Sequence, residues 1–204
     1  MRLFVAVLPP PQAIAELAAA VAPLHALPQA GALRWTGEPS WHLTLAFLGQ
    51  VDAAVLPALE SGLARVADGC DRAPELRLAG GGNFGERALW ADVSGDTRLL
   101  RRLAEEVVGA ARESGIDVDE RPFRAHLTLA RAAGRGATRL SPLADALAGF
   151  SGAAWPATGL RLMRSHLGTG PAHYETVREW TLGAAAGAAS AAGEGDGDGA
   201  LPGR

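Results

Sequence analysis

The sequence predicts a protein of mixed strands and helices that is built from two similar halves. Segments with the alternation of strands are separated by segments with helical periodicity along most of the chain. The pattern of the second half resembles that of the first. In addition, the pentapeptide His-Leu-Thr-Leu-Ala begins at His42 and recurs at His126. A segment repeated in this way indicates a repeated structural unit.

Strands are expected where β-prone residues lie between turn residues, and helices where apolar residues recur every three or four positions. The expected strands span residues 3–8, 33–36, 41–48, 75–79, 88–93, 123–131, 158–167 and 174–182. The expected helices span residues 12–22, 52–67, 96–114 and 142–147. Glycine-rich turns are expected at 80–85 and 168–171.

The C-terminal segment 184–204 differs in composition from the rest of the chain. It consists largely of alanine, glycine and acidic residues, with a single late leucine. Such a segment cannot bury enough apolar surface to offset the entropy lost on ordering. We therefore expect one domain over residues 1–183, followed by a disordered tail.

Composition excludes several classes of protein. No apolar run reaches the roughly 18 residues needed to cross a bilayer, so no membrane association is expected. Cys70 is the only cysteine, which rules out an intramolecular disulfide and a cysteine-based zinc site and fits a cytoplasmic setting. Acidic residues on either side of Cys70 disfavour its thiolate, so we do not expect it to be a nucleophile.

The repeated pentapeptide predicts a shared site. On a strand, His42 and Thr44 point to one face while the intervening leucines point to the other, and the same holds for His126 and Thr128. A single copy would be explained by a half-buried strand with polar residues turned to solvent. Solvent places no demand on residue identity, so the second copy favours two imidazoles and two hydroxyls arranged around one small anion.

Two histidines suit displacement at phosphorus. An imidazole titrates near pH 6.5, so one can act as a base on water while the other protonates the leaving oxygen. Threonine hydroxyls can donate hydrogen bonds to the non-bridging oxygens, where charge grows in the transition state. No metal or cofactor is expected, because this chemistry needs none and the sequence has no His-Glu-x-x-His motif or clustered carboxylates.

With these motifs the sequence resembles the two-histidine (2H) phosphoesterase superfamily, which is marked by paired His-x-Thr-x motifs. More narrowly, it resembles the bacterial and archaeal RNA 2',3'-cyclic phosphodiesterases, formerly described as 2'-5' RNA ligases. The resemblance covers about residues 1–183 and departs at Ala125, where the family usually has proline. It is carried by the segments 2–7, 41–49, 88–90, 121–131 and 174–182.

The resemblance implies an α+β fold with two pseudo-symmetric lobes. Each lobe would be an antiparallel sheet with helices packed on its outer side, and the active-site cleft would lie between the lobes. It implies that His42 is the proton donor to the leaving 3' oxygen and His126 the proton acceptor from water, giving a 2'-phosphate. Thr44 and Thr128 would bind the phosphate.

The resemblance also implies that Phe47 and Arg131 flank the terminal base and phosphate. The expected partner is RNA with a 2',3'-cyclic phosphate end, or a short oligonucleotide, bound by a monomer. Simple alternation places Phe47 on the leucine face unless a bulge or the strand end turns it. Arg131 is likewise out of phase with His126, and a plain surface arginine is the alternative for it. Alternative functions are 2'-5' RNA ligation, cleavage of 2'-5' oligonucleotides, or binding of RNA ends without catalysis.

Overall fold

The computed structural model describes residues 1–118, 121–134, 139–166 and 173–183. The predicted tail and the predicted turn at 168–171 lie outside these residues. No helix in the described part of the chain is long and apolar enough to span a membrane.

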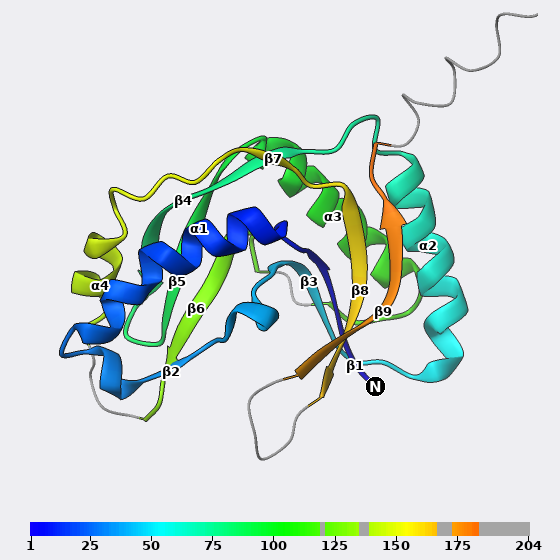
Figure 1. Cartoon of the computed structure of the whole chain (residues 1–204). Coiled ribbons are helices and arrows are strands. Elements are labelled where there is room, and N and C mark those ends of the chain that lie inside the picture. The colour runs from blue at the N-terminus through cyan, green and yellow to red at the C-terminus, as the bar shows by residue number, and fades with distance from the viewer. Residues whose placement is uncertain (119–120, 135–138, 167–172, 184–204) are drawn as a thin grey trace, which may run out of the picture.

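Within the described residues, nine strands form one antiparallel sheet in the order β7-β4-β5-β6-β3-β1-β8-β9, with β2 pairing beside β6 (Figure 1). The strands are β1 (Arg2–Val7), β2 (Leu33–Trp35), β3 (Leu43–Gln50), β4 (Glu75–Phe84), β5 (Ala88–Gly95), β6 (His126–Ala132), β7 (Trp155–Pro156), β8 (Gly159–His166) and β9 (His173–Thr181). The helices are α1 (Pro11–Val21), α2 (Leu56–Asp68), α3 (Thr97–Glu113) and α4 (Ser141–Ala146), with short 3-10 turns η1 (Ala22–Ala26), η2 (Ala30–Ala32), η3 (Glu38–Ser40) and η4 (Ala53–Val55).

The sheet is curled and consists of two halves. The first half-sheet contains β1, β3, β8 and β9, and the second contains β2, β4, β5, β6 and β7. The two halves are joined by one residue pair, Leu43 of β3 opposite Leu127 of β6. These are the leucines that directly follow the two repeated histidines. The α+β class and the arrangement in two similar halves are therefore confirmed.

The helices interlock the two halves. Helices α2 and α3 pack against the first half-sheet, and α1 and α4 pack against the second (Figure 1). Yet α1 follows β1 in the chain while it packs against β4, and α3 follows β5 while it packs against β3. Each half-sheet is thus covered partly by a helix that follows a strand of the other half-sheet.

The core explains why the motif leucines are fixed in place. Leu43, Leu45, Leu127 and Leu129 are almost fully buried in one cluster with apolar residues of the helices. In α3, buried residues recur every three or four positions and form the stripe that faces this cluster. The opposite face of the motif strands is therefore left for the histidines and threonines.

One predicted turn is wrong. The glycine-rich segment 80–85 was expected to separate two strands, but β4 continues through it to Phe84. Its pairing with β5 shifts between Leu78 and Gly81, where Gly80 has a φ of 75°. The glycines therefore form a β-bulge inside the strand, because glycine adopts positive φ without strain. Smaller differences are that β6 begins at His126 instead of residue 123 and that the short β7 was not predicted.

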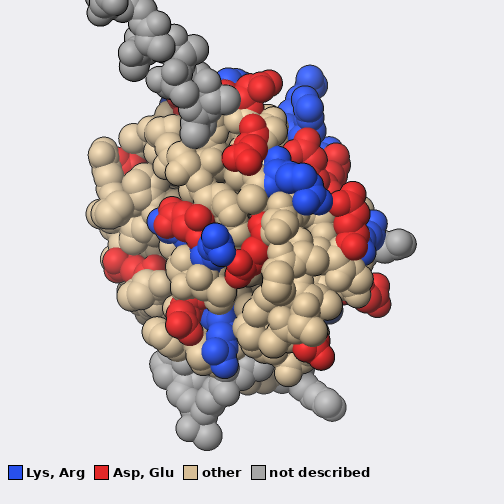
Figure 2. Space-filling model, turned by 90° about the vertical axis from the view of Figure 1, so that its right-hand side faces the viewer, with Lys and Arg blue, Asp and Glu red and all other residues tan. Residues whose placement is uncertain are grey.

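The surface over α2 and β9 has a balanced charge. Figure 2 shows acidic and basic side chains interspersed on this side of the molecule. Arg65 pairs with Glu113, and Arg178 pairs with Glu60. Arg65 and Arg178 on this surface are therefore compensated by neighbouring carboxylates.

Candidate active site at the junction of the half-sheets

The two repeated motifs meet at the single pair that joins the half-sheets. With Leu43 opposite Leu127, the antiparallel register places Thr44 towards His126 and His42 towards Thr128. The four polar side chains share one face, which we call the histidine face. His42 and His126 are diagonal neighbours in this register, and the Cα atoms of diagonal neighbours lie about 7–8 Å apart. The structure thus brings the predicted histidines and threonines together around one centre.

A β-bulge in each motif strand decides where Phe47 points. In β3, Ala46 pairs with Val5 but Thr44 pairs with Ala6, so Leu45 is the extra residue. The bulge turns Phe47 to the histidine face, where it pairs with Phe4. Its side chain is 55% exposed, so the alternative of a core position is wrong.

The second motif strand has its bulge at the equivalent place. Ala130 pairs with Leu89 but Thr128 pairs with Trp90, so Leu129 is the extra residue. The same turn brings Arg131 to the histidine face. Phe47 and Arg131 therefore occupy equivalent positions in the two halves, five residues after their histidines.

Aromatic rings hold each imidazole. His42 lies 4.8 Å from the ring of Phe4 and 5.1 Å from that of Tyr174, measured between ring centroids. His126 lies 4.9 Å from the ring of Phe84 and 6.2 Å from that of Trp90. The rings come from neighbouring strands of each half-sheet, so the two imidazoles have similar half-buried surroundings.

Backbone hydrogen bonds fix the orientation of both imidazoles. The Nδ1 of His42 lies 2.8 Å from the carbonyl oxygen of Ser40, and the Nδ1 of His126 lies 2.8 Å from that of Arg124. A carbonyl can only accept a hydrogen bond, so each Nδ1 carries a proton and donates it. Each Nε2 is therefore the nitrogen that gains or loses a proton, as a general acid or base requires.

Burial favours the neutral form of both imidazoles. Desolvation, opposed by the hydrogen bond to Ser40 and assisted by the charges of His126 and Arg131, lowers the pKa of His42 from 6.5 to about 4. Desolvation is also the main cause that lowers the pKa of His126, with smaller contributions from Arg131 and Arg124. An anion bound between the rings would oppose both effects, because it favours the charged imidazole.

The histidine face is electropositive on the side of the second half-sheet. Arg131 is exposed, and its charge lowers the pKa of both histidines, so its guanidinium lies near both. The guanidinium of Arg124 lies over the Trp90 ring at 4.4 Å from the centroid. Neither hydroxyl of Thr44 or Thr128 has a hydrogen-bond partner within the described residues. Both hydroxyls can therefore donate to an oxyanion.

Several residues of this surface were missed from the sequence. Phe4, Tyr174, Phe84 and Trp90 touch the imidazoles, and Arg124 orients one of them through its carbonyl. The alternation in β1 gives a usable signal for Phe4, because Leu3 and Val5 face the helices. Phe84 lies in the segment 80–85, which was interpreted as a turn. The contact of Tyr174 with His42 depends on the pairing of strands that are distant in the chain.

Other residues fall outside the candidate site. Cys70 is buried, which raises the pKa of its thiol. His166 bonds to Glu175 on β9. Among the described residues, no three histidine, cysteine or acidic side chains are gathered as metal ligands would be.

Comparison with known proteins places this arrangement in a family. The family model described as LigT like Phosphoesterase matches residues 7–90 and 92–173, which is most of the chain. The chain belongs to the LigT-like phosphoesterases. Within this family, it is 37% identical over 184 residues to the RNA 2',3'-cyclic phosphodiesterase of Thermus thermophilus, covering 82% of this chain and 83% of that protein.

Two further relatives of this LigT-like phosphoesterase are informative. It is 39% identical to the RNA 2',3'-cyclic phosphodiesterase of Geobacillus stearothermophilus, but that match covers 48% of this chain and 32% of that protein. The solved structure of Escherichia coli LigT complexed with 3'-AMP has a TM-score of 0.69 and 28% identity. That match covers 89% of this chain and 97% of the solved one.

Proposed function

We propose that this LigT-like phosphoesterase hydrolyses RNA 2',3'-cyclic phosphate ends to 2'-phosphomonoesters with His42 and His126 as general acid and base. One observation carries the proposal. Two imidazoles lie on one face at the junction of the half-sheets, and each donates Nδ1–H to a backbone carbonyl and keeps Nε2 for proton transfer. Relatives named RNA 2',3'-cyclic phosphodiesterase and the neighbour bound to 3'-AMP support an RNA end as substrate.

In the proposed reaction, the Nε2 of neutral His126 takes a proton from water as the water oxygen bonds to phosphorus. The bond from phosphorus to the ribose 3' oxygen breaks, and the Nε2 of His42 gives its proton to that oxygen. The product carries a 2'-phosphate and a 3'-hydroxyl. Thr44 and Thr128 donate hydrogen bonds to the non-bridging oxygens, where negative charge increases in the transition state.

The lowered pKa of His42 suits a donor. An imidazolium with a pKa of about 4 is a strong acid and gives up its proton readily to a developing alkoxide. The bound phosphodiester supplies the negative charge that keeps His42 protonated before the reaction. The charges of Arg131 and Arg124 add to the attraction for that anion.

The test is incubation with a short oligonucleotide ending in a 2',3'-cyclic phosphate, with and without EDTA. We expect a 2'-phosphate product, no effect of EDTA, and a loss of about 10²–10⁴ in kcat for His42→Ala and His126→Ala. His25→Ala, which removes an exposed imidazole on η1, is the matched control and should keep full activity. Turnover retained in either of the first two variants, a 3'-phosphate product, or binding without product would contradict the proposal.

A further inference from the structure

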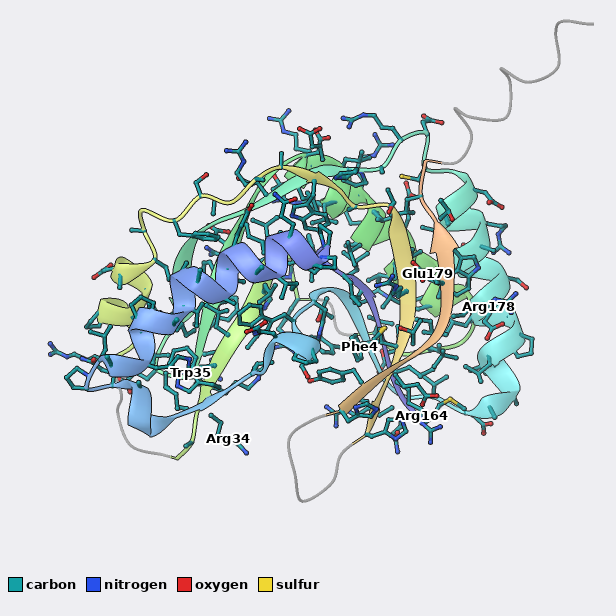
Figure 3. The ribbon with its side chains drawn as sticks, in the orientation of Figure 1. Phe4, Arg34, Trp35, Arg164, Arg178 and Glu179 are labelled. Carbon is teal, nitrogen blue, oxygen red and sulfur yellow. The ribbon has the colours of Figure 1, made fainter. Side chains whose placement is uncertain are left out.

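Strand β2 places a second arginine beside Arg131. β2 pairs with β6, and Arg34 stands directly opposite Arg131. Side chains of such a pair point to the same face, with Cβ atoms about 4.5–5.5 Å apart. The next pair, Trp35 and Ala130, belongs to the core on the opposite face. Arg34 therefore adds a cation to the histidine face, and Figure 3 shows it pointing outward from β2.

These two guanidinium groups are not used inside the protein. Both side chains are exposed, and neither has an ion pair or hydrogen bond within the described part of the chain. By contrast, Arg161 and Arg178 on β8 and β9 each pair with a glutamate. Like charges directly opposite each other on a sheet are destabilising. A cross-strand pair of arginines without an acidic partner is therefore suited to binding an external anion.

The position of the pair indicates which phosphate it would bind. The charge of Arg131 acts on both imidazoles, so its guanidinium lies near the reacting centre. Strand β6 rises about 3.3 Å per residue, so the backbone of the arginine pair lies roughly 15 Å beyond that of His126. The long side chain of Arg131 can extend back towards the reacting phosphate, whereas Arg34 lies farther from that phosphate.

We propose that Arg34 and Arg131 together bind the phosphodiester that precedes the terminal nucleotide of the RNA. The guanidinium group matches the oxygens of a phosphate in a two-pronged geometry, and two of them can share one anionic linkage. Phe47 is the equivalent residue of the first half-sheet, so one side of the site is aromatic and the other is cationic. The enzyme therefore recognises a chain end through its backbone charge.

This inference rests on the proposed function and is tested with two dinucleotides that end in a 2',3'-cyclic phosphate. One has a normal internucleotide phosphate and the other a neutral methylphosphonate. For the unmodified enzyme, we expect kcat/KM to fall about tenfold on the neutral linkage, because a charge-assisted hydrogen bond is lost. For Arg34→Gln, we expect kcat/KM on the charged dinucleotide to fall by a similar factor, and the two dinucleotides to react within about twofold of each other.

The matched control is Arg102→Gln, an exposed arginine of α3 on the helix side of the first half-sheet. It should keep the tenfold preference for the charged linkage. Arg34→Lys should keep part of that preference, because lysine retains the charge without the planar fork. If Arg34→Gln discriminates between the two linkages as strongly as the unmodified enzyme, Arg34 does not bind this phosphate.

Failure of the proposed function would look different. In that case the unmodified enzyme would turn over neither dinucleotide. The same pair of linkages, in dinucleotides ending in a 3'-phosphate, would then be compared by binding. A preference for the charged linkage that Arg34→Gln abolishes would still support the arginine pair, and equal binding of both would overturn it.

Discussion

Replacing His42 by asparagine and lowering the pH tests whether burial keeps this imidazole neutral in the folded protein. Asparagine preserves a donor near the position of Nδ1, which bonds to the carbonyl oxygen of Ser40, but it does not titrate. The comparison therefore isolates the protonation of Nε2 from the loss of the backbone hydrogen bond. The imidazole lies between Phe4 and Tyr174, so its charge is poorly hydrated.

The magnitude follows from the pKa of His42, which desolvation lowers from 6.5 to about 4. Because the folded pKa is the lower one, the unfolded chain binds more protons between these values. The stabilisation is therefore present above pH 6.5 and lost as the pH falls towards 4. At about 1.4 kcal/mol per pKa unit, the full loss is about 3.4 kcal/mol, of which about 2 kcal/mol is lost between pH 7.5 and pH 5.

The assay is denaturant unfolding of the wild type and His42→Asn at pH 7.5 and pH 5. The wild type should lose about 2 kcal/mol more than the variant over this interval. Thr44→Val changes the same face without removing a titrating group, and it should follow the wild-type pH dependence. Equal losses for the wild type and His42→Asn would show that the imidazole is not held neutral by its surroundings.

Three other predictions concern the same surface. Thr44→Val and Thr128→Val should each lower kcat about 10²-fold, measured in single turnovers, and an effect on KM alone would contradict their proposed role on the transition state. Gly82→Ala should cost about 1–3 kcal/mol in the free energy of unfolding and lower activity, because a Cβ there would overlap the Trp90 ring beside His126. The control is Gly109→Ala in α3, where an added Cβ points into open space, and it should stabilise the protein slightly. Above pH 7, kcat/KM should fall about tenfold per pH unit, because both histidine pKa values lie below 6.5 and the singly protonated enzyme becomes rare; a plateau up to pH 9 would contradict this.

The histidines and threonines could be predicted because their signal is local. The alternation of His42, Leu43 and Thr44 assigns each side chain to a face, and the second copy indicates a shared site. The structure adds that Leu43 and Leu127 form the junction pair, so the two histidines flank the centre of the pseudo-symmetry. No pattern within either motif could predict that pairing, because it joins strands from different halves of the chain.

The positions of Phe47 and Arg131 could not be derived from alternation, since each depends on a bulge. Both bulges fall on the residue after the motif threonine, Leu45 in β3 and Leu129 in β6. An extra residue reverses the facing of all residues that follow it on the strand. Likewise, the position of Arg34 opposite Arg131 depends on the pairing of β2 with β6. Short-range periodicity cannot predict that pairing.

The two histidines have similar aromatic and backbone contacts, but a carboxylate lies beside His126. Asp92 of β5 pairs directly with His126 of β6, and its carboxylate raises the pKa of that imidazole, although desolvation still makes the net shift downward. On the equivalent side of His42, β1 ends at Val7, and the next residue is Leu8, which packs in the apolar cluster around Phe4.

The Asp92 carboxylate raises the pKa of His126 against the lowering by desolvation, Arg131 and Arg124, so it acts in the direction that the proposed role of His126 as a base requires. Asp92→Asn should therefore lower the pKa of His126, followed by the NMR signal of its ring, and reduce kcat/KM about two- to fivefold at neutral pH. Asp145→Asn, an exposed carboxylate on α4, should change neither quantity. If the pKa of His126 falls and kcat/KM is unchanged, the basicity of His126 does not limit the reaction.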